Sequence, residues 1–177
     1  MELFAQVVGL LAMAFNISSY QFKRKEHVLL CQMLGGGLFA VNMFLLDAYM
    51  GCFLNVLAVV RALAYLFAEK KGCSKKPLTV FINFLFCLSY ALTFTLFQKP
   101  PTAWNLFVEF LPLAGMLAMT VAFGKGDAKA IRRCGFFTSP CWLVYNCISF
   151  SIGGIACEAV SLISITSAYL RLDRRKK

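Results

Sequence analysis

Polar side chains able to bind a solute occur inside apolar stretches of this sequence. Trp142, Tyr145, Asn146 and Ser149 follow one another at intervals of three, one and three residues. That spacing places all four on one face of an α-helix. Because an amide can hydrogen-bond a polar solute and aromatic rings can stack on one, we expect this face to line a cavity. The alternative is that Asn146 bonds a neighbouring helix and only holds the helices together.

Two ionisable residues, Arg61 and Glu158, also lie within apolar segments. Arg61 follows the expected start of its segment by about ten residues, or roughly 15 Å at the rise of an α-helix. An arginine at that depth costs about 2.5–3.5 kcal/mol even on the lenient insertion scale, so it should face a cavity or a partner. Two interpretations stay open. Either Arg61 forms a structural ion pair with Glu158, with Glu109 as the other acidic candidate, or these charges bind a solute or a coupling ion.

The composition defines the elements that must position these residues. The chain has 177 residues, of which 60% are hydrophobic and 15% are charged. Soluble domains carry about 25% charged residues, and a transmembrane helix needs about 20 mostly apolar residues. We therefore predict an all-α polytopic membrane protein with seven transmembrane helices and no soluble domain. The predicted segments are residues 4–22, 28–46, 50–68, 77–98, 104–123, 131–150 and 153–171.

The basic residues test this number of segments. Seven crossings place sixteen of the 18 lysine and arginine residues on the side of the C-terminus, with Lys99 opposite and Arg61 within a segment. The positive-inside rule then puts the N-terminus outside and the C-terminus in the cytoplasm. The net charge of +10 is explained by this topology and by attraction to anionic lipid at the cytoplasmic face, and it does not indicate nucleic acid.

Similar sequence in the two halves of the chain indicates an internal repeat. GLLAM at 9–13 resembles GMLAM at 115–119. Further along, a match between positions 104 residues apart aligns Asn42 with Asn146. Short apolar matches also arise by chance, but both halves have basic residues after their first segment, which favours the repeat. We therefore expect both amides at one depth, facing a shared central cavity.

A 3 + 1 + 3 arrangement of parallel three-helix bundles follows from this repeat. The expected units are residues 1–72, a linking transmembrane helix at 73–99, and residues 100–177 with a basic cytoplasmic tail. Each unit crosses the membrane three times, so its chain ends on the side opposite to the one where it began. Two directly fused units would therefore insert in opposite orientations, and one extra crossing between them restores the parallel orientation. Parallel repeats of this kind are one of the transporter plans, with the site near the midplane between the repeats.

Several other classes of function are disfavoured by the motifs. No H-E-x-x-H and no ATP-binding motif occurs, and we expect no metal, no cofactor and no enzymatic activity. The eight cysteines include no C-x-x-C pair, and five lie in apolar segments, which favours reduced, buried thiols.

The motifs of the second half resemble those of the YgjV family of bacterial inner-membrane proteins. The resemblance rests on CWLVYN at 141–146, SIGG at 151–154 and Glu158, together with Arg61. It implies a multi-pass protein of the bacterial inner membrane. The layout is also similar to that of SWEET sugar transporters and PQ-loop proteins, but Tyr20 stands where the Pro-Gln pair would begin.

We expect a transporter or facilitator of a small polar or anionic solute, either passive or ion-coupled. Arg61 would attract an anionic group or pair with Glu158, the amides would bind polar groups, and the aromatic rings would stack. The expected binding residues are Asn42, Arg61, Trp142, Tyr145, Asn146 and Glu158. The alternative is a non-transporting membrane protein that binds a partner or anionic lipid and uses Arg61 and Glu158 only structurally.

Overall fold

The computed structural model describes residues 2–19, 25–125 and 128–170, and these form seven helices. The helices are α1 (Glu2–Ser19), α2 (Lys25–Leu45), α3 (Tyr49–Lys70), α4 (Lys75–Thr95), α5 (Ala103–Lys125), α6 (Ala128–Ile148) and α7 (Ile152–Ala168). Each one overlaps a segment predicted from the sequence, and the all-α class is confirmed. Lys23, Arg24 and the basic residues from 171 onward lie outside the described residues.

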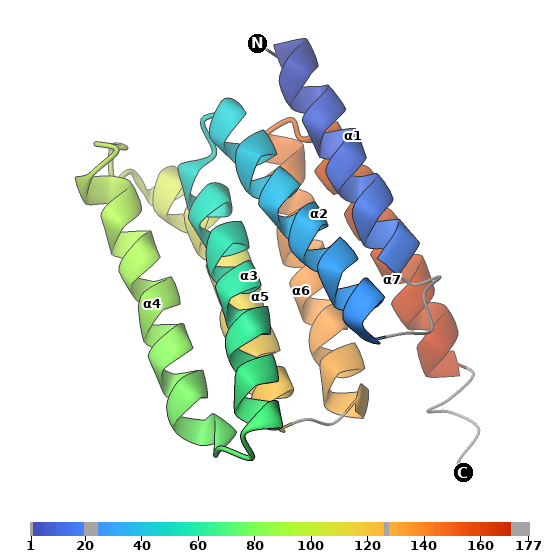
Figure 1. Cartoon of the computed structure of the whole chain (residues 1–177). Coiled ribbons are helices and arrows are strands. Elements are labelled where there is room, and N and C mark those ends of the chain that lie inside the picture. Colours follow the sequence, from blue (N-terminus) through green and yellow to red (C-terminus); the bar gives the residue numbers. More distant parts are fainter. Residues whose placement is uncertain (1, 20–24, 126–127, 171–177) are drawn as a thin grey trace.

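Three of the described helices, α3, α4 and α5, are long and apolar enough to cross a membrane. Shorter apolar stretches lie in α1, α2 and α7, at residues 2–18, 33–45 and 152–167. Successive helices run in opposite directions, so α1, α3, α5 and α7 all begin at the end drawn uppermost in Figure 1. We call this the upper end and the opposite one the lower end.

Six helices pack in a closed ring, and α4 lies outside it (Figure 1). Around the ring α1 contacts α2, α2 contacts α3, α3 contacts α5, α5 contacts α6, α6 contacts α7, and α7 returns to α1. The extensive contacts of α4 are with α3 and α5. Leu54 of α3, Phe86 of α4, Met116 of α5 and Trp142 of α6 belong to one buried cluster, which forms the hydrophobic core.

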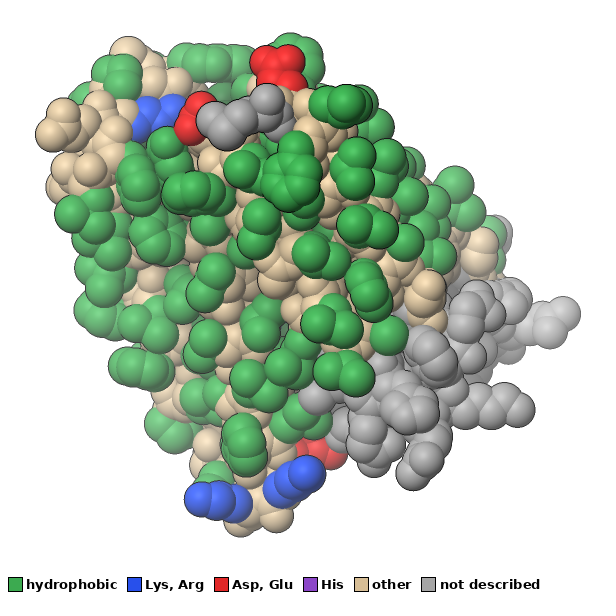
Figure 2. All heavy atoms as spheres, turned by 45° about the horizontal axis from the view of Figure 1, so that its top comes forward, with side chains coloured by type: hydrophobic (Ala, Val, Ile, Leu, Met, Phe, Trp, Pro, Cys, Tyr) green, Lys and Arg blue, Asp and Glu red, His purple; other side chains and the backbone are tan. Residues whose placement is uncertain are grey.

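The outer surface of the bundle is apolar. Every described helix exposes large hydrophobic side chains, for example Phe4, Phe44, Phe67, Phe84, Phe107, Phe137 and Ile163. Figure 2 shows hydrophobic side chains covering one face, with the coloured charged side chains near its two ends. A soluble monomer rarely exposes so large an apolar patch, whereas a lipid-facing surface requires one.

The α2–α3 turn and the α6–α7 turn have the same backbone structure. Asp47 has φ 55° and Phe150 has φ 54°, an unusual conformation for residues other than glycine. Ala48 N donates to the carbonyl five residues before it at 2.9 Å, and Ser151 N does the same at 3.0 Å. Equivalent positions at these two turns are therefore 103 residues apart.

This register differs by one residue from the alignment expected from the sequence. Leu46 N donates to Asn42 O at 3.1 Å, and Ser149 N donates to Tyr145 O at 2.9 Å. Asn42 therefore occupies the position of Tyr145, and the counterpart of Asn146 is Met43.

The same register applies where the first helix of each half crosses the second. A Cβ placed on Gly35 of α2 would lie 3.1 Å from the carbonyl oxygen of Ala12 in α1. At the positions 103 residues later, the Thr138 hydroxyl of α6 donates to the carbonyl oxygen of Gly115 in α5 at 3.1 Å. Small residues on both crossings let the helix backbones approach closely.

Candidate functional site

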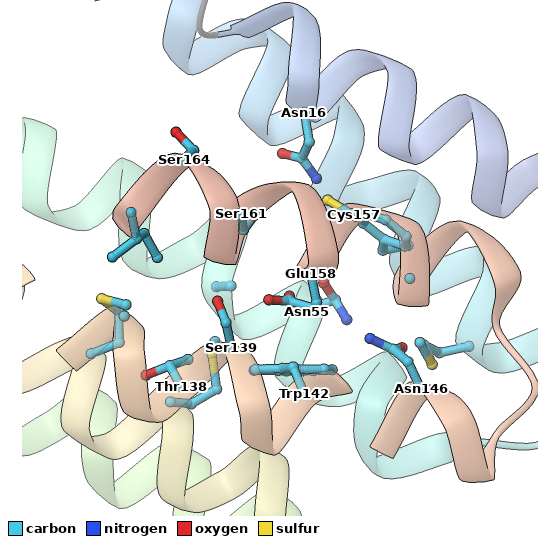
Figure 3. Close-up of a pocket in the computed structure, with 18 of the residues that line it drawn as sticks. Asn16, Asn55, Thr138, Ser139, Trp142, Asn146, Cys157, Glu158, Ser161 and Ser164 are labelled. Atoms are coloured by element: carbon cyan, nitrogen blue, oxygen red, sulfur yellow. The ribbon is translucent and has the colours of Figure 1, made fainter. Parts of the chain in front are cut away.

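A cavity of about 650 Å³ lies inside the ring of six helices. All six ring helices contribute to its lining, and α4 does not. Figure 3 shows polar side chains from α1, α3, α6 and α7 converging on this space. The described polar residues of the lining include Asn16, Asn55, Arg61, Ser139, Asn146, Glu158, Ser161 and Ser164. So many polar groups are unusual in a chain that is 60% hydrophobic, and they make the cavity the candidate binding site.

Four of the six residues singled out from the sequence line this cavity. They are Arg61, Trp142, Asn146 and Glu158. The other two, Asn42 and Tyr145, lie outside its lining, in a buried layer nearer the upper end. The one-residue register difference accounts for this, because adjacent residues of a helix point about 100° apart.

Asn42 is completely buried, and both ends of its amide are engaged. Its Nδ2 donates to Ala5 O at 2.8 Å, and its Oδ1 accepts from the Ser151 hydroxyl at 2.6 Å. It therefore joins α2 to α1 and to the N-cap of α7, as expected of an asparagine that holds helices together. Tyr145 has a similar position in the other half, where its hydroxyl accepts from the backbone N–H of Gly51 in α3 at 3.0 Å.

Asn146 differs from Asn42 in having an unused acceptor. Its side chain is drawn toward the cavity in Figure 3, its residue is only 2% exposed, and its Oδ1 has no hydrogen-bond partner. The amide packs against Gly154, where any larger residue would collide with it. The glycine therefore makes room for the asparagine at the edge of the cavity.

Glu158 of α7 lies beside Ser139 of α6 in the cavity lining (Figure 3). Trp142 lies one turn further along the same face of α6 and also lines the cavity. Its ring packs edge-on against Tyr145, with centroids 5.9 Å apart and an interplanar angle of 86°. The carboxyl group and the indole ring therefore lie side by side on the cavity wall.

Arg61 has a different partner from the one expected. Its Nη1 donates to the Thr120 hydroxyl of α5 at 2.9 Å, and its guanidinium lies 5.1 Å from the ring centroid of Phe123 and 5.8 Å from that of Phe86. Among the described residues, no ion pair joins it to Glu158 or Glu109.

The helix geometry explains why the pair with Glu158 does not form. Both α3 and α7 begin at the upper end, and Arg61 is the thirteenth residue of α3 whereas Glu158 is the seventh of α7. The difference of six residues separates their backbones by about 9 Å along the bundle. Arg61 instead extends to α5, beside a second cavity of about 330 Å³ that also reaches Tyr65 and Glu69.

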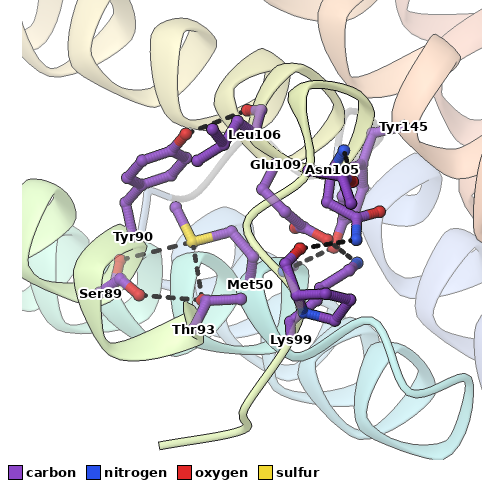
Figure 4. Close-up of polar contacts among 12 residues, drawn as sticks. Met50, Ser89, Tyr90, Thr93, Lys99, Asn105, Leu106, Glu109 and Tyr145 are labelled. Carbon is purple, nitrogen blue, oxygen red and sulfur yellow. Dashed lines mark hydrogen bonds and ion pairs between the residues drawn. The ribbon is translucent and has the colours of Figure 1, made fainter. Parts of the chain in front are cut away.

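Glu109 is buried and has its own cation. Lys99, from the loop between α4 and α5, forms an ion pair with its Oε1 (Figure 4). The other carboxyl oxygen, Oε2, is buried without a hydrogen-bond partner.

Five polar residues of the cavity lining are not among those expected from the sequence, namely Asn16, Asn55, Ser139, Ser161 and Ser164. A signal existed for two of them. Ser139 precedes Trp142 by three residues, so it continues the polar face already identified on α6. Asn55 precedes Arg61 by six residues and stands 103 residues before Glu158, but only the structural register reveals that correspondence.

Within the described part of the chain, no cluster of three or more histidine, cysteine, aspartate or glutamate residues is arranged to hold a metal ion. Neither a curated protein nor a solved structure matches the chain. A family model does match: the Imp-YgjV model, described as a bacterial inner membrane protein, covers residues 3–176. The chain therefore belongs to the Imp-YgjV family of bacterial inner membrane proteins.

Proposed function

We propose that this protein moves a small polar solute across the inner membrane through the cavity inside the helix ring. The observation that carries the proposal is the polar lining of that cavity in a bundle whose outer surface is apolar. A purely structural bundle would fill its interior with hydrophobic side chains, because buried polar groups without partners are costly. A cavity of about 650 Å³ is within the range of small-molecule sites.

We further propose that the two units expected from the sequence, residues 1–72 and 100–177, are related by an internal two-fold axis. The common 103-residue register at two turns and at two helix crossings relates α1, α2 and α3 to α5, α6 and α7. In the ring, the α3–α5 and α7–α1 contacts are then equivalent. The fourth helix, within 73–99, lies outside this relation, as a linker between two parallel repeats would.

The cavity lining follows the same register. Several lining residues of the first half have a lining counterpart 103 residues later, as in the pairs Phe39 and Trp142, Asn55 and Glu158, and Arg61 and Ser164. The cavity therefore lies on the proposed two-fold axis, where transporters built from parallel repeats bind their solutes. The two walls match in position but differ in charge, so they would bind an asymmetric solute.

The orientation that we propose places the upper end outside the cell and the lower end in the cytoplasm. Lys70, Lys71, Lys75 and Lys76 flank the α3–α4 turn at the lower end, whereas Lys99 is at the upper end. This asymmetry follows the positive-inside rule, and the basic lower end would also attract anionic lipid.

In this orientation the described conformation is closed toward the outside. Two sets of hydrogen bonds link the halves above the cavity. One set joins the first half to the α6–α7 turn: Ser151 donates to Asn42, Gln6 of α1 donates to Phe150 O, and Ile152 N donates to Gln6. The other is the bond from Gly51 to Tyr145. Opening toward the outside requires both to break as one half rocks against the other. The acceptors Asn42 and Tyr145 occupy equivalent positions in the two halves, whereas the donors Ser151 and Gly51 do not.

The test is uptake by proteoliposomes from a mixture of metabolites, followed by mass spectrometry of the vesicle contents. We expect one class of solute to accumulate with wild-type protein and not with Asn146→Leu, whereas Cys73→Ser, an exposed loop change, behaves as wild type. If no solute accumulates while the purified protein retains a bound partner or anionic lipid, the non-transporting alternative is favoured.

A further inference from the structure

Among its described residues the cavity has one carboxyl group, that of Glu158, and one guanidinium group, that of Arg61, and their surroundings differ. Arg61 already has a hydroxyl acceptor on Thr120 and two aromatic rings within 6 Å of its guanidinium, from Phe86 and Phe123. Ring faces stabilise a cation, so the protein itself compensates this charge. Arg61 is therefore a poor candidate for the main contact to a solute.

Glu158 has much less compensation. The neutral Ser139 hydroxyl lies beside it (Figure 3), and a carboxylate has room for about four hydrogen bonds. No cation forms an ion pair with it among the described residues. Its remaining acceptor capacity faces the cavity, where Figure 3 shows Glu158 directed toward Ser139 and the open space.

The groups around Glu158 favour the same kind of solute atom. Asn146 Oδ1 is a buried acceptor without a partner. Trp142 presents its indole at the same wall, and tryptophan is the ring that binds cations best. The carboxylate and the face of the indole ring both attract a positively charged donor, whereas the Asn146 oxygen packs against Gly154.

We propose that the cavity recognises an organic ammonium group, held by Glu158 and Trp142. This inference rests on the proposed transport function, because it names the solute class of the same cavity. It replaces the anionic solute expected from Arg61 with a cationic or zwitterionic one. Arg61, about 9 Å further toward the lower end, is then available to a distant anionic group of a zwitterion.

The first test needs no variant in the cavity. Trp142 fluorescence is recorded in a Trp104→Phe protein, whose replaced residue is 62% exposed and outside the cavity, during titration with n-butylammonium, n-butanol or butyrate. We expect saturable change with n-butylammonium only. Saturation by butyrate or equally by n-butanol, or no response to any of the three, overturns the proposal.

A matched pair of variants then tests the residue. Glu158→Gln keeps the size of the side chain but removes its charge, so n-butylammonium should bind at least about tenfold more weakly. Glu2→Gln, an exposed change in the first turn of α1, should leave binding unchanged. Equal binding by both variants contradicts the role of Glu158.

Flux measurements separate this inference from the transport proposal. Binding of n-butylammonium without vesicle uptake of any amine would sustain the ammonium site and overturn transport. Uptake of neutral or anionic solutes without competition by n-butylammonium would sustain transport and overturn the ammonium site. Competition by amino acids, compared with competition by diamines that have no carboxylate, distinguishes a zwitterionic solute from a purely cationic one.

Discussion

At the scale of single residues, two asparagines of the same chemistry have different surroundings. Asn42 uses both ends of its amide to join three helices, whereas Asn146 keeps a buried acceptor free at the edge of the cavity. A side chain with all its partners supplies stability, and one without them is available to a ligand. The contrast assigns the two residues different roles despite their identical type.

Removing each amide should therefore have different effects. Asn42→Leu leaves the Ala5 carbonyl and the Ser151 hydroxyl without their partner, and we expect the free energy of unfolding to fall by about 1–3 kcal/mol. Asn146→Leu should cost less than about 1 kcal/mol, because its acceptor has no bond to lose. Thermal unfolding in detergent measures both. Equal losses would contradict the distinction.

Arg61 and Glu158 should act independently on stability, since they do not form an ion pair. In a double-mutant cycle with Arg61→Met and Glu158→Gln, the two losses should add within about 0.5 kcal/mol. The matched cycle of Arg61→Met with Thr120→Val joins residues in direct contact, so its coupling should exceed about 0.5 kcal/mol. A larger coupling in the first cycle would indicate the ion pair that the sequence had suggested.

At the scale of elements, the crossing of α1 and α7 closes the helix ring. A Cβ built on Gly153 would fall on the backbone of Gly9 and Leu10, so these two helices are in backbone contact there. Gly153 and Gly154 of the SIGG segment lie inside the first turn of α7, where the missing side chain of Gly153 permits this close packing. Gly37 of α2, by contrast, has open space around the added atom.

Gly153 and Gly37 form a matched pair for substitution by alanine. Gly153→Ala should push α7 away from α1 and lower the free energy of unfolding by about 1–3 kcal/mol, since backbone atoms cannot yield as a side chain can. Gly37→Ala should raise it by up to about 1 kcal/mol, because alanine is the better helix former. Thermal unfolding of both variants is the measurement, and a stable Gly153→Ala protein would exclude the backbone contact.

At the scale of the whole molecule, the odd number of helices determines where the chain ends lie. With seven crossings, reporters fused to the two termini should be active on opposite sides of the membrane, outside at the N-terminus and in the cytoplasm at the C-terminus. A phosphatase active only outside and a fluorescent protein active only inside measure this. Reporters active on the same side would remove α4 as a crossing and with it the parallel repeats.

Much of this architecture was predictable from the sequence because it depends on local composition. Apolar runs of about 20 residues, interrupted by charged or glycine-bearing breaks, are enough to locate seven helices. The spacing of Trp142 and Asn146 was likewise enough to identify one cavity face, because helical periodicity is local.

What only the tertiary structure decided is the register between the halves and the partner of each charge. Two alignments of the halves that differ by one residue pair Leu- and Ala-rich segments almost equally well. Adjacent helix positions point about 100° apart, however, and in the observed register Asn42 points away from the cavity. The depth of each charged residue was likewise decided by the tertiary structure. Arg61 and Glu158 both lie within apolar segments of the sequence, but their backbones are about 9 Å apart along the bundle. Arg61 therefore bonds Thr120, and Glu158 faces the cavity. Such distances depend on how helices pack against one another, and no local pattern encodes them.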